Sequence, residues 1–270
     1  MSNTFDVSSD GLFILREVPV KADLPSVLWY LGHGADDLAK EGKRPGPSFA
    51  RARRRTNLSK KDEEYLLPDE DGQVEKGLLS RSEELTDLAA GYLSPQAFFR
   101  IEPVSLAGRD EVKLGGVGLK SARLLQLLNG CRECALFLTT LGNGIDEPIR
   151  SYQDKKDPRA ARILEAVASA SLLDLTQKLQ RRIELIAKKE RLRVTHCQWP
   201  GFCDWPEEQV QSLLPRLKSK GELKVKWRRG AFDPSWSFVG LVGLGEQVSR
   251  IKNNPCRRCD NRKLCPSRIW

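Results

Sequence analysis

At the middle of the sequence stands the stretch Cys134-Ala135-Leu136-Phe137-Leu138-Thr139-Thr140, seven residues without a glycine, a proline or a charge. An uninterrupted run of this kind predicts a strand that is buried within a sheet. Gly142-Asn143-Gly144 follow closely and predict a sharp turn into the next helix. The centre of the fold is therefore expected at this strand.

The longest expected helix runs from Arg159 to about Glu190. Its apolar residues recur at gaps of three, four and five, which places them on one helix face. They are Ile163, Val167, Leu172, Leu175, Leu179, Ile183 and Ile186. Further helices are expected at 24–31, 80–94, 119–128 and 207–217, further strands at 97–103, 112–114, 193–198 and 222–227, and a short helix after Gly245. These elements alternate without a run of strand–helix–strand units, which predicts an α+β fold.

The composition predicts one domain spanning residues 1–270, with a hydrophobic fraction of 40% and a charged fraction of 30%. No apolar run of 18 residues is present, and the N-terminus lacks the basic and apolar regions of a signal peptide. We therefore expect a cytoplasmic protein without a membrane partner. In that compartment thiols stay reduced, so the seven cysteines favour metal or redox chemistry over disulfides.

The formal net charge is +9, and much of the excess lies between Lys40 and Lys61, in a segment with several arginines. An acidic stretch follows at 62–71. Neither has an apolar periodicity that could pack on a core, so residues 40–78 are expected to form a basic loop insertion. The alternative is a phosphate-binding arm that contacts nucleic acid or an acidic protein.

Three cysteines near the C-terminus have the spacing of metal or cluster ligands. Cys256, Cys259 and Cys265 form a C-x₂-C-x₅-C pattern in a polar tail at about 253–270, and Cys203 is the candidate fourth thiol. Two cysteines with two residues between them can both bind one zinc ion or one iron–sulfur cluster, and a third cysteine a few residues later can bind the same centre. Cys197 is the reserve ligand. The alternative is a tail whose cysteines are reduced and bind nothing.

Glycines 115, 116 and 118 precede an expected helix and invite comparison with a phosphate-binding loop. The segment lacks the Lys-Ser/Thr of a P-loop and the full dinucleotide fingerprint, so a turn that opens a helix is the preferred interpretation. The sequence contains two histidines and no nucleophile elbow, which excludes histidine-rich metal sites and gives no sign of a catalytic triad. Cys131 and Cys134 are expected to be packed thiols.

The stretch from His196 to Trp205 combines an expected strand with a Pro-Gly turn and three aromatic residues. Pro200, Gly201 and Phe202 are expected to line a concave site, because a Pro-Gly turn leaves backbone groups unpaired and Gly201 lets a ligand come close. The rings of Trp199, Phe202 and Trp205 could stack on adenine or another flat group. The alternative is a proline-braced turn with aromatic packing.

Several segments together resemble the reactivation domain of cobalamin-dependent methionine synthase, in a freestanding form. Residues 139–142 (Thr-Thr-Leu-Gly) match a strand end of that family, and residues 166–174 match its helix with small residues and a Leu-Asp. Residues 200–209 match a Pro-Gly-Tyr motif that runs into Trp-Pro and Gln. Freestanding members also carry a cysteine after that motif and three at the C-terminus, as this chain does. The resemblance spans about 20–35 and 80–270.

This resemblance implies an α+β fold with a bent antiparallel sheet, S-adenosylmethionine as ligand and a corrinoid protein as partner. In the full enzyme the domain binds S-adenosylmethionine beside the corrinoid, so that inactive cob(II)alamin is reduced and remethylated. Two positions differ: Cys197 aligns with the family arginine that holds the ligand carboxylate, and Phe202 aligns with the tyrosine. Arg193 is the nearest substitute for the arginine.

Three functions are compatible with the sequence. The first is an accessory protein of cobalamin-dependent methyl transfer, working with a corrinoid protein. The second is an iron–sulfur or zinc protein with an electron-transfer or structural role, which could coexist with the first. The third is a basic nucleic-acid-binding module, which ranks last because the cysteine pattern has no neighbouring histidine and the aromatic residues do not interleave with the basic run.

Overall fold

The computed structural model describes residues 6–16, 18–31, 76–218 and 224–250. The expected basic insertion, apart from the residues after 75, and the expected cysteine tail lie outside the described residues. Helices in the described part are α1 (Leu24–Leu31), α4 (Lys76–Ala90), α5 (Ala122–Leu128), α6 (Asp146–Asp154), α7 (Pro158–Lys189) and α8 (Val210–Leu213). Strands are β1 (Asp6–Val7), β2 (Phe13–Arg16), β3 (Gln96–Ala107), β4 (Glu111–Leu114), β5 (Val117–Lys120), β6 (Glu133–Thr140), β7 (Arg193–Val194), β8 (Lys226–Arg228), β9 (Ala231–Asp233) and β10 (Ser237–Gly245).

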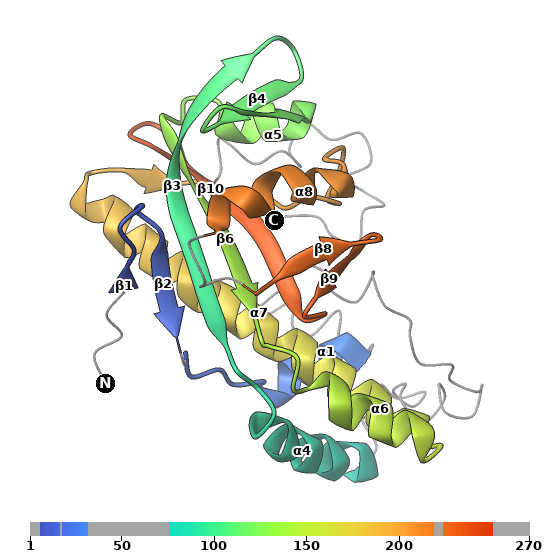
Figure 1. The fold of residues 1–270 in the computed structure, drawn as a ribbon. Helices are drawn as coiled ribbons and strands as arrows, with labels where there is room; N and C mark the ends of the chain where they lie inside the picture. The colour runs from blue at the N-terminus through green and yellow to red at the C-terminus, as the bar shows by residue number, and fades with distance from the viewer. Residues whose placement is uncertain (1–5, 17, 32–75, 219–223, 251–270) are drawn as a thin grey trace, which may run out of the picture.

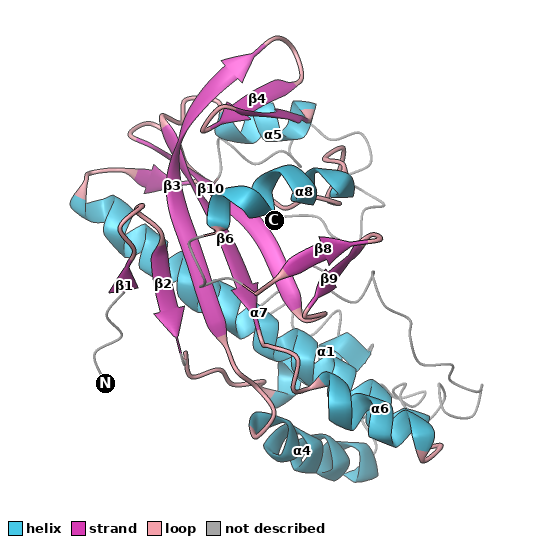
Figure 2. Ribbon diagram, viewed as in Figure 1, coloured by secondary structure: helices cyan, strands magenta, loops and turns pink. Residues whose placement is uncertain are grey.

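One curved antiparallel sheet organises the molecule, in the order β1-β2-β3-β6-β10-β7 (Figure 1). The predicted strand 134–140 is β6, and it lies at the centre between β3 and β10. Beyond Pro103, β3 leaves β6 and pairs with β4, which in turn pairs with β5. Strands and helices therefore form an α+β arrangement with a bent antiparallel sheet, which confirms the predicted fold class (Figure 2).

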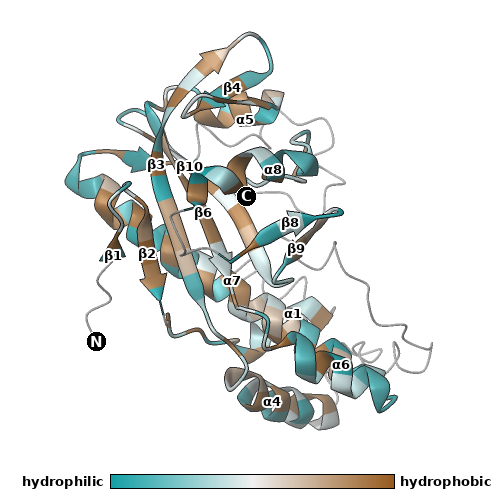
Figure 3. Ribbon diagram, in the orientation of Figure 1, coloured by the Kyte–Doolittle hydropathy of each residue, from teal (hydrophilic) through white to brown (hydrophobic). Residues whose placement is uncertain are grey.

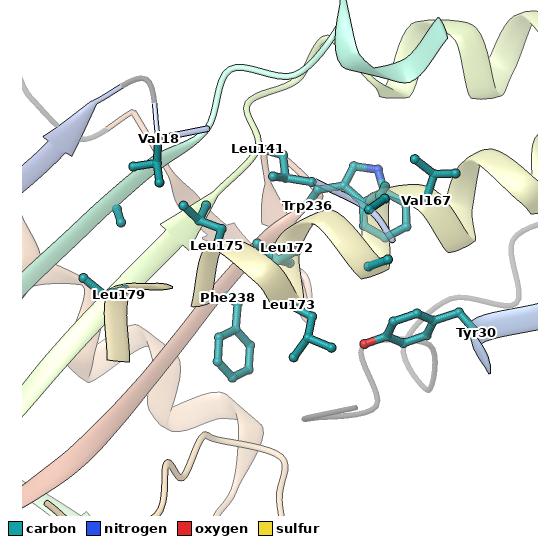
Figure 4. Packing of buried hydrophobic residues seen from close by; sticks show 14 of the residues in the cluster. Val18, Tyr30, Leu141, Val167, Leu172, Leu173, Leu175, Leu179, Trp236 and Phe238 are labelled. Atoms are coloured by element: carbon teal, nitrogen blue, oxygen red, sulfur yellow. The ribbon is translucent and has the colours of Figure 1, made fainter. Parts of the chain in front are cut away.

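Helix α7 covers one face of the sheet, as its apolar periodicity predicted. The Asp157 side chain accepts a hydrogen bond from the Ala160 N–H at 3.0 Å, and Pro158 occupies the first turn, so the helix starts with a cap and a residue suited to that position. Six of the seven predicted apolar residues are buried and Ile186 is partly buried. Figure 4 shows Leu172 and Leu175 of α7 in the buried cluster that also contains Phe238 of β10 and Tyr30 of α1.

The two faces of the sheet belong to two separate hydrophobic clusters. Along β6, Ala135 and Phe137 join α7 in the first cluster, whereas Leu136 and Leu138 join α5, α8 and the β4–β5 hairpin in the second. This alternation follows from the two-residue period of a strand, and because both faces are covered the strand contains no exposed position after Glu133. In Figure 3 the middle of β3 and much of β10 carry the colour of hydrophobic residues.

The polar end of β6 is satisfied by neighbouring hydroxyls. Thr176 on α7 donates its hydroxyl to the Leu172 carbonyl at 2.8 Å, so the buried Thr139 hydroxyl must donate to Thr176, 3.0 Å away. Thr140 lies 2.8 Å from the Ser237 hydroxyl and accepts from the Gly142 N–H at 3.2 Å. The Thr-Thr-Leu-Gly segment thus fastens β6 to α7 and β10.

The glycine segment at 115–118 forms a hairpin, so the expected helix start at 119 is wrong. Leu114 pairs with Val117, which leaves Gly115 and Gly116 as a two-residue turn with φ values of 53° and 90°. Positive φ at both central residues is the requirement of a tight type I′ hairpin. The phosphate-loop interpretation has no support, because α5 begins only at Ala122, capped by the Ser121 hydroxyl.

β10 is the largest element that the sequence did not predict. Residues 237–245 were not expected to form a strand, yet all nine are buried and eight pair with β6. The expected helix at 207–217 is instead the short helix α8 between two 3₁₀ turns, Glu207–Gln209 and Leu214–Leu217. The other expected strands and helices are present, most with shifted ends, except the short helix expected after Gly245, which is not found in the described residues 246–250. No helix of the described part is both long and apolar enough to cross a bilayer.

Candidate functional site

The Pro-Gly turn at residues 199–206 wraps around the outer edge of β10. Gln198 precedes it and exchanges both backbone hydrogen bonds with Leu241, at 2.9 and 2.8 Å. Trp199 then packs against the first cluster, on the α7 face, whereas Trp205 is buried in the second cluster on the opposite face. The turn therefore passes from one face of the sheet to the other.

Hydrogen bonds inside the turn fix its shape. The Gly201 N–H donates to the Trp205 carbonyl at 2.8 Å, the Phe202 N–H to Trp199 at 3.2 Å and the Trp205 N–H to Phe202 at 3.1 Å. Gly201 has a φ of 86°, which only glycine adopts without strain. These three N–H groups are paired, so the prediction that the turn leaves them unpaired is wrong.

A second set of contacts ties the turn to the start of α5. The Asp204 carboxylate accepts from the Ser121 hydroxyl at 2.7 Å and from the Arg123 N–H at 3.2 Å. Three residues beyond Pro206, the Gln209 side chain bonds to both backbone groups of Lys120, at 3.0 and 3.1 Å. A carboxylate at a helix N-terminus satisfies N–H groups that lack intrahelical partners. This anchor could not be predicted from a local sequence pattern, because 83 residues separate Asp204 from Ser121.

Three aromatic rings meet at the turn. The ring centroids of Trp199 and Phe202 are 4.4 Å apart, and those of Trp199 and Phe238 are 5.7 Å apart. Phe202 and Phe238 are buried, whereas Trp199 is half-buried and can offer part of its ring to a ligand. Trp205, expected as a third stacking face, is 2% exposed and takes no part. Phe238 is instead the third ring of the cluster, and it was not expected beside the turn because β10 was not predicted.

The edge of β10 beside this cluster carries backbone groups that point toward the turn. Because Leu241 bonds outward to Gln198, the two-residue period directs the N–H and C=O of Val239 to the same edge. No described residue is hydrogen-bonded to them. A buried donor or acceptor left unpaired costs about 1–3 kcal/mol, so a group that bonded to Val239 would recover that free energy.

Arg193 does not lie near the turn. It pairs with Gly245 at the far end of β10, whereas Trp199 contacts Phe238 at the near end. Seven residues of strand separate the two positions, roughly 23 Å at 3.3 Å per residue. Pro200, Gly201 and Phe202 are thus brought together by the turn, and Arg193 is not brought to them. Cys197, which aligns with the family arginine, packs close to Gly240.

Of the four predicted metal ligands, Cys203 is the one that lies within the described residues. This residue is exposed and has a φ of 57°, so the turn directs its side chain away from the core. Cys256, Cys259 and Cys265 lie outside the described residues, and within residues 6–250 as described no group of three metal-binding side chains occurs. Burial raises the pKa of the Cys197 thiol, which disfavours the thiolate and weakens the case for Cys197 as reserve ligand.

His196, just before the turn, predicts a pH dependence of stability. Burial lowers its pKa to about 4, and the charge of Arg250 acts in the same direction. Since the unfolded histidine has a pKa of about 6.5, its contribution is complete above pH 6.5 and is lost as the pH falls toward 4. We expect the free energy of unfolding, measured with urea, to fall by about 1 kcal/mol between pH 7 and pH 4.5, a value reduced to allow for solvent screening of the partly exposed ring. This fall should be missing in His196→Gln. Equal losses in both proteins would contradict this assignment.

The comparisons with known proteins agree with the geometry of the sheet. No protein-family model matches the sequence, and no curated protein is significantly similar to it. Among solved structures, the chain is similar to a crystal structure of the MetH reactivation domain bound to AdoHcy, with a TM-score of 0.56 and 12% sequence identity. The match covers 88% of this chain and 80% of that chain. The chain therefore shares the fold of that domain, as the resemblance in its sequence implied.

Proposed function

We propose that the chain is an accessory protein of cobalamin-dependent methyl transfer, which binds S-adenosylmethionine at the 199–206 turn and docks on a corrinoid protein. The observation that carries the proposal is the shared fold over 88% of the chain with a reactivation domain that binds AdoHcy. The Pro-Gly turn, which the sequence resemblance places at the family's ligand motif, is held by three backbone hydrogen bonds and has an aromatic cluster beside it.

The residues of the turn suit the nucleoside and sulfonium parts of that ligand. The half-buried Trp199 offers a face for adenine, and the edge groups of Val239 offer a donor and an acceptor. The Glu207 side chain passes 3.6 Å from the position that a Cβ would take on Gly201, so an exposed carboxylate stands beside the turn. This carboxylate would attract the positive charges of S-adenosylmethionine, namely its sulfonium and ammonium groups.

Calorimetric titration tests the proposal. We expect saturable binding of both S-adenosylmethionine and AdoHcy, and no binding of free methionine, because the turn contacts the nucleoside. Glu207→Gln should weaken S-adenosylmethionine more than AdoHcy, since only the former carries the sulfonium charge, and Glu208→Gln is the matched control one residue away. Absence of binding of either nucleoside at millimolar concentration would refute the ligand, although the shared fold would stand.

A metal centre at Cys203 is the second proposal, and it is compatible with the first. Its support is Cys203, which is exposed and has a left-handed backbone conformation that costs a non-glycine residue about 1 kcal/mol. With three thiols of the tail it would complete a four-sulfur set. Anaerobically purified protein should contain iron or zinc, and Cys203→Ser should lower the metal content by half or more, whereas Cys131→Ser should not. Metal-free protein would refute the centre.

A further inference from the structure

A small apolar groove lies between β2 and α7. Its volume is about 240 Å³, and it is formed where the end of β2 and the segment after it meet the C-terminal half of α7. Its apolar lining comes from Leu15, Val18, Ala97, Leu175, Leu179 and Leu185. Figure 4 shows Val18, Leu175 and Leu179 side by side at one end of the packed cluster. Leu185, at the rim, is 53% exposed.

The wall of this groove is fixed by Lys178. Its ammonium group donates to the Pro19 carbonyl at 2.6 Å and to the Asp174 carboxylate at 2.7 Å, and the same carboxylate accepts from the Lys21 N–H at 2.9 Å. The segment after β2 is thereby clamped against α7. The groove is therefore preformed, and Lys178 is already neutralised by its own partner.

Two arginines at the rim carry charge that no carboxylate in the described part of the chain neutralises. Arg181 and Arg182 both line the groove, and neither forms an ion pair with any described carboxylate. The chain around them is strongly basic, with seven basic and three acidic residues between 174 and 193. Of those acids, Asp174 pairs with Lys178, and Glu184 with Lys188 and Arg250. A net positive field thus surrounds an apolar hollow.

We infer that this groove docks an acidic segment of a partner protein that inserts one or two large aliphatic side chains. An apolar centre with a polar rim is the arrangement of a protein interface. A nucleic acid would need the charge but not the exposed Leu185 and the apolar hollow. A membrane surface could contact the exposed Leu185, but it would leave the concave apolar lining of the groove unfilled. A small carboxylate would need one cation and would not explain the basic surface that extends to Arg193.

This inference does not depend on the proposed ligand, because the groove shares no residue with the turn. Its test uses a fluorescein-labelled synthetic peptide, Glu-Asp-Glu-Leu-Leu-Glu-Asp-Glu, and fluorescence polarisation with the full chain. We expect saturable binding that weakens with salt, because exposed charges are screened over about 10 Å at 0.1 M. A peptide with serine in place of both leucines should bind at least fivefold more weakly.

Variants then place the binding on the groove. Arg181→Glu/Arg182→Glu should weaken the peptide at least tenfold, and Leu185→Ser about fivefold. The control Lys226→Glu/Arg228→Glu makes the same charge change on β8, which belongs to the opposite face of the sheet. It should alter binding less than twofold. Circular dichroism melting confirms that each variant is folded, and because both arginines contact solvent the double variant tests the inference even if Leu185→Ser unfolds.

Three results would overturn the inference. Equal losses in the β8 control would show unspecific charge attraction, and equal binding of the serine peptide would show that the apolar hollow is not used. Binding of phosphatidylglycerol vesicles or of decanoate in place of the peptide would assign the groove to a lipid. Loss confined to the arginine and leucine variants is the result that the groove predicts.

Discussion

Gly245→Ala is expected to lower the free energy of unfolding by about 3 kcal/mol, the largest stability effect predicted for this chain. A Cβ on Gly245 would lie 2.5 Å from the Gly130 carbonyl oxygen and 3.2 Å from the Cys131 Cα. Both are backbone atoms at the end of α5, so they cannot rotate away as a side chain can. Overpacking of this kind costs about 1–3 kcal/mol and more where the backbone must move.

Thermal unfolding followed by circular dichroism measures this effect. A loss of about 3 kcal/mol corresponds to a fall in Tm of roughly 6–12 °C for a protein of this size. Gly91→Ala is the matched control, because a Cβ there meets only the Leu88 carbonyl oxygen at an ordinary 3.7 Å. Similar Tm values for the two variants would show that β10 does not approach α5 as closely as described.

Trp199→Ala should weaken the binding of AdoHcy and of S-adenosylmethionine by about tenfold or more. Stacking of a base on an aromatic ring contributes about 1–3 kcal/mol, and 1.4 kcal/mol is a factor of ten in Kd. Trp199 is the ring of the cluster with solvent contact, since Phe202 and Phe238 are buried beneath it. The loss should be smaller in Trp199→Phe, which keeps a flat face.

Trp227→Ala provides the control for the removal of a large ring. Trp227 is also half-buried and also packs against a phenylalanine, but in the second cluster. The ring centroids of Trp227 and Phe232 are 4.7 Å apart. The Trp227→Ala variant should bind both nucleosides with Kd values within about twofold of those of the unchanged chain. If Trp227→Ala weakens binding as much as Trp199→Ala, the ligand does not sit on the turn.

The sequence predicted those parts of the fold in which a local pattern fits only one type of secondary structure. β6 is apolar without interruption, and α7 repeats its apolar residues over many turns, so both were predicted almost to their ends. β10 was not predicted because Gly240, Gly243 and Gly245 interrupt its apolar run, and glycines at such spacing are typical of turns. Close packing explains the glycine at position 240: a Cβ there would lie 2.8 Å from the Phe137 ring and 3.0 Å from the Gln198 carbonyl oxygen.

The site was predicted in part for a similar reason. Pro200, Gly201 and Phe202 are neighbours in sequence, so the turn they form could be recognised from local chemistry. Phe238 and the anchor from Asp204 to Ser121 come from distant segments, and only the sheet brings them to the turn. Arg193 was expected beside the turn, but the register of β7 pairs it with Gly245, at the other end of β10.

Photo-crosslinking with 8-azido-S-adenosylmethionine tests the central claim most directly, because it reports both binding and position. Trypsin cleaves after Arg193 and Arg216, which releases the whole turn as one peptide, residues 194–216. We predict that the label is attached to this peptide, and that excess AdoHcy prevents the attachment. Labelling of peptides from α7, or labelling that AdoHcy does not reduce, would contradict the proposed site.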